Sequence, residues 1–217
     1  MDLVSSKYIE EFIPGEKLYH GAIQVTPFRN KEYIKKFSKN YALGIDSKLA
    51  GSLGYIDPNI QIKKQNFGIE SPSMVSQGYL FNVGFGLSVH DISFNAIANL
   101  SYKNLRYGVP AYEGDILFAT SEVLGIEVKK DGASNGSVQV RTTITNQDNK
   151  VVLEYVRQVL VRATKGTTLD TQSSIQDQPD RIGLTESMMP LKFHNLPNKF
   201  NGKEVKSFED FEIDKVY

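Results

Sequence analysis

Three histidines, His20, His90 and His194, are the side chains of this chain best suited to move protons near neutral pH. His90 is followed directly by Asp91, and a carboxylate with an imidazole is a common pair in general acid–base chemistry. Consecutive residues of a strand point to opposite faces, so we do not expect His90 and Asp91 to act as one pair. His20 lies at the end of a predicted strand and is interpreted as structural. His194 lies in an irregular tail and is expected to be exposed.

The composition narrows the possible functions. The 217 residues include no cysteine, which excludes a disulfide framework, a thiolate zinc site and a cysteine nucleophile. Lysine plus arginine and aspartate plus glutamate are equal at 25 each, so no net field favours nucleic acid or an acidic membrane surface. No apolar run approaches transmembrane length, and the first residues do not resemble a signal peptide. We expect a cytoplasmic protein with no metal, no cofactor, no nucleic acid partner and no membrane partner.

The elements that must position any site begin with a set of strands. Residues 116–128, 138–146 and 151–162 are rich in β-formers, and turn signals separate them at 129–137 and 147–150. This order predicts an antiparallel meander. Residues 100–107 are predicted to add one more strand.

The N-terminal half predicts helices. After a possible strand at residues 17–26, residues 31–37 have helical spacing and residues 47–53 suggest a further short helix. Residues 74–89 are apolar and long enough for a buried helix, although their glycines weaken that prediction. The order predicts an α+β fold in which a long central helix lies against one face of a curved antiparallel sheet.

The composition also divides the chain. Residues 1–164 are predicted to form the folded domain, and residues 165–206 are polar and irregular, as is typical of a linker. Residues 208–214 then repeat the pattern of residues 9–15, with an apolar residue, two acids and a phenylalanine. We therefore predict that residues 207–217 start a second copy of the domain or form a C-terminal tail.

Two segments resemble a known family. Residues 85–102 resemble the signature of mesaconyl-CoA hydratases, also called β-methylmalyl-CoA dehydratases, which are MaoC-like hot-dog enoyl-CoA hydratases. Residues 110–117 resemble the wider MaoC pattern of a proline, a spacer and Gly-Asp before a long strand. The resemblance implies the hot-dog fold, in which an antiparallel sheet encloses a long central helix. It also implies a double-hot-dog polypeptide, of which this chain holds the first hot dog, the linker and the opening of the second.

The catalytic pair of that family is missing from this chain. MaoC-like hydratases carry an Asp and a His around Asn-Pro, just ahead of a short helix whose counterpart here is residues 48–55. That alignment places Gly44 at the His position and Lys39 at the Asp position, and no histidine occurs between His20 and His90. The resemblance therefore implies no catalytic residue in this half.

The expected function follows from the resemblance. It implies a MaoC-like acyl-CoA hydratase or dehydratase in which this chain alone is inactive and shapes the acyl-CoA pocket. Asp91, Asn95 and Asn99 are the candidate substrate-binding residues. The expected partners are an acyl-CoA thioester and a second hot-dog domain or subunit, within a homo-oligomer. Two alternatives remain open: a non-catalytic hot-dog protein that binds acyl thioesters or a partner, and a hot-dog thioesterase, which needs a carboxylate but no histidine.

Overall fold

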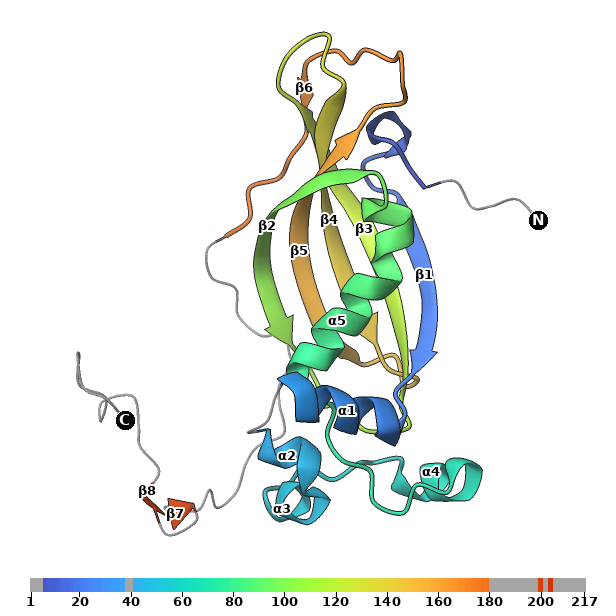
Figure 1. Ribbon diagram of the computed structural model, residues 1–217, viewed down its shortest axis with the longest axis vertical. Helices are drawn as coiled ribbons and strands as arrows, with labels where there is room; N and C mark the ends of the chain where they lie inside the picture. Colours follow the sequence, from blue (N-terminus) through green and yellow to red (C-terminus); the bar gives the residue numbers. More distant parts are fainter. Residues whose placement is uncertain (1–5, 38–40, 180–198, 201–202, 205–217) are drawn as a thin grey trace.

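A curved antiparallel sheet encloses one long helix in the computed structural model, which describes residues 6–37, 41–179, 199–200 and 203–204 (Figure 1). The strand order is β1-β3-β4-β5-β2, and β6 pairs with β3. The strands are β1 (Lys17–Gln24), β2 (Ala96–Tyr107), β3 (Ile116–Val128), β4 (Asn135–Thr145), β5 (Val151–Arg162) and β6 (Gln172–Ser173). A short separate pair is formed by β7 (Lys199–Phe200) and β8 (Lys203–Glu204). The α+β arrangement predicted from the sequence is confirmed.

The helices lie inside the sheet and at one end of it. The central helix is α5 (Gln77–Ser88), and it continues into η2 (Val89–Ser93), a turn of π-helix. The other helical segments are η1 (Ile9–Glu11), α1 (Pro27–Phe37), α2 (Ala42–Ile45), α3 (Ser47–Ser52) and α4 (Ile60–Phe67). In Figure 1, α1 to α4 gather at the end of the sheet where α5 begins. The sequence reading missed η1, α2 and α4, which are short or have little apolar periodicity to reveal them.

The buried helix α5 is apolar on most of its surface, as expected for a helix that is enclosed rather than laid on a surface. Leu80 and Val83 lie in the core. Gly84 faces β4, where an added Cβ would lie 2.5 Å from the Cδ1 of Ile144. The glycine that weakened the helix prediction therefore permits the close approach of α5 to the sheet.

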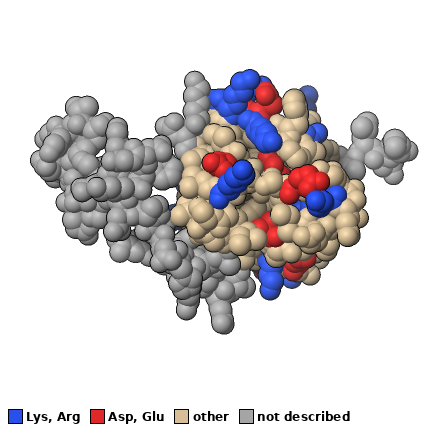
Figure 2. All heavy atoms as spheres, turned by 90° about the horizontal axis from the view of Figure 1, so that it is seen from below, with Lys and Arg blue, Asp and Glu red and all other residues tan. Residues whose placement is uncertain are grey.

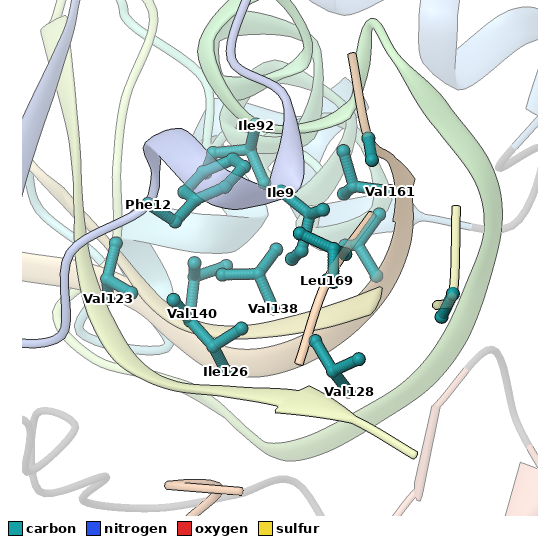
Figure 3. Close-up of a cluster of buried hydrophobic side chains, with 13 residues drawn as sticks. Ile9, Phe12, Ile92, Val123, Ile126, Val128, Val138, Val140, Val161 and Leu169 are labelled. Atoms are coloured by element: carbon teal, nitrogen blue, oxygen red, sulfur yellow. The ribbon is translucent and has the colours of Figure 1, made fainter. Parts of the chain in front are cut away.

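Two apolar clusters fill the interior. One lies beside η1 and η2, and Figure 3 shows Ile9, Phe12 and Ile92 directed toward Val138 and Val140 of the sheet. The other lies beneath α5 and contains Val25, Val75, Leu80, Val83, Ala111, Leu117, Ala119, Ile144, Val152, Leu153 and Tyr155. The N-terminal segment thus closes one end of the space that α5 occupies at the other.

The Gly-Asp turn before β3 holds α4 through a buried ionic cluster. The ammonium of Lys63 in α4 lies 2.7 Å from a carboxylate oxygen of Asp57 and 2.6 Å from one of Asp115. Asp115 also accepts a hydrogen bond from the backbone N–H of Tyr112 at 2.7 Å. Removing one member of such a cluster leaves an uncompensated buried charge, so we infer that this turn has a structural role.

The segment after β5 contacts the sheet. Through β6 it pairs with β3, and Gln176 exchanges hydrogen bonds with Gln139 of β4. The proposed linker of residues 165–206 therefore begins along the sheet, and its boundaries stay a prediction. The sequence repeat at residues 208–214 lies outside the described residues.

The surface shows no segregation of charge on the face that carries α1 to α4. Figure 2 shows lysine and arginine interspersed with aspartate and glutamate over that face. Within the described ranges, no helix is both long enough and apolar enough to cross a membrane.

We predict that Gly114→Ala destabilises the domain by about 2–4 kcal/mol. Gly114 has a φ of +88°, and an added Cβ would lie 2.9 Å from Ile69 Cδ1 and 3.0 Å from Lys63 Cδ. The measurement is the urea unfolding midpoint. The matched control is Gly132→Ala, because Gly132 has a φ of +71° with no atom within 4 Å of the added Cβ. The control carries only the backbone strain, about 1 kcal/mol, and equal losses in both variants would contradict the packing argument.

Candidate functional site

A row of buried polar side chains crosses the sheet beneath the C-terminal end of α5. Alternate residues of a strand face the helix, and one such row contains Ser121, Thr142 and Arg157, each at most 2% exposed. The positions two residues before and after them on β3, β4 and β5 are buried and apolar: Ala119, Val123, Val140, Ile144, Tyr155 and Val159. The row therefore lies between the two apolar clusters.

His20 joins this row from β1. Its Nδ1 lies 2.6 Å from Oδ2 of Asp91, and its Nε2 lies 2.8 Å from Oγ of Ser121. Ser121 in turn lies 2.8 Å from Oγ1 of Thr142. Because an ionised carboxylate only accepts hydrogen bonds, Nδ1 donates to Asp91 and Nε2 accepts from Ser121. A fully buried imidazole is thus held from both sides.

Local backbone irregularities bring these residues together. The pairing of β1 with β3 shifts between Tyr19 and Ala22, and Gly21 has a φ of +88°. His20 lies in this bulge, which re-aims side chains relative to a regular strand. The π-helical turn η2 places Asp91 at the end of α5.

The surroundings keep His20 neutral at pH 7. Burial lowers the pKa of His20 below its usual value, and the nearby charge of Arg157 lowers the pKa further. The hydrogen bond and charge of Asp91 act in the opposite direction but do not overcome the burial.

Arg157 is the unusual member of the row. Its Nη2 donates to Oγ of Ser88 at 3.0 Å, and its guanidinium carbon lies 5.2 Å from the centre of the Phe85 ring. No carboxylate of the described residues forms an ion pair with it. Among those residues, its Nε and Nη1 have no hydrogen-bond partner, nor does the hydroxyl of Tyr155. Burial lowers the pKa of Arg157, while Tyr155 and Tyr102 favour its charged form.

The order Asp91–His20–Ser121 matches a nucleophile, a base and an orienting acid. Ser121, however, is 2% exposed and lies 2.8 Å from the hydroxyl of Thr142. A substrate carbonyl has no route to a hydroxyl in that position. The arrangement supports a structural or positioning role for His20, in line with the sequence interpretation.

The structure separates the three predicted substrate-binding residues. Asp91 contacts His20, whereas Asn95 donates to the backbone oxygen of Ser6 at 2.9 Å and so holds the N-terminal segment. Asn99 lies exposed on β2. Their part in substrate binding therefore remains a prediction.

The prediction that His90 and Asp91 lie in a strand is wrong, because they lie in the π-helical turn η2. Their side chains are 3.7 Å apart, and the close partner of Asp91 is His20, 71 residues away. Gly44 is buried in α2, while Lys39 and His194 lie outside the described residues.

Sequence reading missed Ser121, Thr142 and Arg157. A signal was present, because each is a polar residue at an inward position of a predicted strand with apolar residues two positions away on both sides. Three such interruptions in neighbouring strands indicate one buried polar row.

Comparison with known proteins shows two similar curated relatives. The chain is 32% identical over 184 residues to the β-methylmalyl-CoA dehydratase of Chloroflexus aurantiacus, covering 84% of this chain and 48% of the relative. It is 49% identical over 159 residues to the mesaconyl-CoA hydratase of Cereibacter sphaeroides, covering 73% of this chain and 42% of the relative. The chain belongs to the MaoC-like hot-dog family. No family model matches this MaoC-like chain.

Solved structures agree with that assignment. A MaoC domain dehydratase from Chloroflexus aurantiacus superposes with a TM-score of 0.70 at 31% identity, covering 83% of this chain and 47% of that one. A Mycobacterium tuberculosis protein with a double hot-dog fold has a TM-score of 0.64 at 19% identity, which shows the fold alone. The MaoC-like chain spans about half the length of the curated relatives it matches.

We predict that His20 makes stability depend on pH. The unfolded chain takes up a proton near pH 6.5, before the folded chain does. The contribution of His20 is therefore complete above about pH 6.5 and is lost as the pH falls below that value toward the folded pKa. The free energy of unfolding, measured in urea from pH 8 to pH 5, should fall less steeply in His20→Gln than in the wild type. The control His90→Gln alters an exposed imidazole and should retain the wild-type slope; an unchanged slope in His20→Gln would contradict the assignment.

Proposed function

We propose that this chain is the N-terminal hot dog of an acyl-CoA hydratase or dehydratase of the mesaconyl-CoA hydratase type. In this proposal it shapes the acyl-CoA pocket, and a second hot dog supplies the catalytic aspartate and histidine. The supporting observation is the combination of clear similarity to two named relatives with the lack of a histidine between His20 and His90.

The geometry at Gly44 supports this division. Gly44 occupies the position that the family resemblance gives to the catalytic histidine, and it is buried. An added Cβ would lie 2.5 Å from Cδ1 of Tyr41 and 2.6 Å from Cδ1 of Ile34. Neighbouring side chains therefore fill the space that an imidazole would need.

The edge strand β2 supports a second hot-dog domain or subunit as the partner. It is 12 residues long, pairs only with β5 among the described strands, and lies at one side of the sheet (Figure 1). Large apolar side chains on or beside it are exposed, namely Phe94, Ile97, Leu100, Tyr102 and Leu105. A long apolar edge is a template for pairing with another sheet. We propose that this edge carries the contact with a second hot dog, within a cytoplasmic homo-oligomer.

We expect the purified 217-residue chain to show no hydration of mesaconyl-CoA or crotonyl-CoA. The physical reason is that the general acid–base pair is missing, which removes the proton transfers that hydration requires. The measurement is loss of the enoyl-thioester absorbance. Robust turnover by the chain alone would overturn the proposal, and a downstream coding segment with Asp, Asn-Pro and His at the family spacing would support it.

We also expect the chain to self-associate through β2. Leu100→Lys should weaken association at least about tenfold, because it places a charge on the pairing edge. Sedimentation equilibrium measures the dissociation constant. The control is Tyr19→Lys, which changes a side chain 77% exposed on the opposite edge strand β1 and should leave association unchanged. A monomeric wild type, or equal weakening by both variants, would contradict the assignment of this edge.

A further inference from the structure

Three hydrogen-bond donors lie together in the core without an acceptor. They are Nε and Nη1 of Arg157 and the hydroxyl of Tyr155, and none has a partner among the described residues. Arg157 and Tyr155 are two positions apart on β5, so both side chains project from the same face of the sheet, and both are 0% exposed. Buried polar groups in native proteins are nearly always paired, so this cluster calls for an acceptor from elsewhere.

The surroundings compensate the charge of Arg157 only in part. The Phe85 ring offers a cation–π contact at 5.2 Å, and Ser88 accepts one hydrogen bond at the C-terminal end of α5. Neither carries a full negative charge. Asp91, the carboxylate in this row, is engaged by His20 at 2.6 Å. The site thus has one positive charge to spare.

Aromatic rings surround these donors and connect them to the surface. The Tyr155 ring lies 5.3 Å from that of Phe81 and 6.0 Å from that of Tyr102. Tyr102 pairs in register with Arg157 across β2 and β5, and it is 40% exposed. A ligand would therefore reach the donors past Tyr102, at the same edge that we assign to the second hot dog.

We propose that Arg157 and Tyr155 bind the free carboxylate of a dicarboxylic acyl thioester and so determine the acyl specificity of the pocket. This inference rests on the proposed function, since the two relatives are named for β-methylmalyl-CoA and mesaconyl-CoA. Both acyl groups carry a carboxylate in addition to the thioester. A carboxylate accepts hydrogen bonds from two nitrogens of one guanidinium, and its single negative charge matches the single uncompensated positive charge.

The protonation states fit this assignment. Burial raises the pKa of Tyr155, so its hydroxyl stays protonated and can donate. The apolar rings of Phe81 and Phe85 are suited to contact the hydrocarbon part of the acyl group. In this arrangement the carboxylate is satisfied by three donors within an otherwise apolar site.

The test is equilibrium binding of two thioesters to the 217-residue chain by calorimetry. Mesaconyl-CoA, with its methyl group next to the thioester carbonyl, carries the carboxylate, and tiglyl-CoA has a methyl group in its place. We expect the wild type to bind mesaconyl-CoA at least about tenfold more tightly. Arg157→Met should weaken mesaconyl-CoA binding about 10- to 100-fold and leave tiglyl-CoA binding unchanged.

Two further variants make the test robust. Tyr155→Phe removes only the hydroxyl and should weaken mesaconyl-CoA binding about three- to tenfold, so it tests the site even if Arg157→Met does not fold. Arg162→Met, on the exposed end of β5, is the matched control and should change neither affinity. Melting temperatures verify that each variant is folded.

The outcomes separate this inference from the proposed function. Equal wild-type affinity for the two thioesters, or equal losses of both in Arg157→Met and Tyr155→Phe, would overturn the carboxylate site and leave acyl-CoA binding intact. Binding of neither thioester would overturn the proposed function and this inference with it. If Arg157→Met weakened self-association while the preference for mesaconyl-CoA persisted, the acceptor would be a partner's carboxylate and the inference would be wrong.

Discussion

Polar groups placed inside a protein must find partners there, and this requirement organises the centre of the hot dog. His20 from β1, Ser121 from β3 and Thr142 from β4 form one chain of hydrogen bonds, and Asp91 attaches it to the turn after α5. The row therefore links three strands to the end of the central helix. The apolar clusters on either side of it set the curvature within which the helix fits.

Arg157 is the exception to that rule, and the exception has a physical meaning. Replacing a buried, incompletely paired charge by an apolar residue often stabilises a protein. A fold that retains such a charge gives up stability for another purpose. Here the free donors lie beside a half-exposed tyrosine on an apolar edge strand, where a ligand and a second domain can both approach. Pocket shaping and domain association would thus share one region of the molecule.

The two anchors of the fold divide the remaining tasks. The ionic cluster of Lys63, Asp57 and Asp115 fixes the helices at one end of the sheet, and the apolar contacts of Ile9, Phe12 and Ile92 close the other end. Between these ends the position expected for a catalytic histidine is occupied by Gly44, packed under Tyr41 and Ile34. The structure of this half is complete around that position without an imidazole, which is consistent with a division of labour between two hot dogs.

The amino-acid sequence alone determined the strands β3 and β5, the buried central helix and the missing catalytic histidine, because alternation, apolar length and residue identity are local properties. The pairing of His20 with Asp91 and the orphan donors of Arg157 and Tyr155 were decided only by the tertiary structure. A β-bulge, a π-helical turn and the register of neighbouring strands create these contacts. Such features arise from packing between segments far apart in the chain, and no local pattern encodes which partner a buried polar side chain will meet.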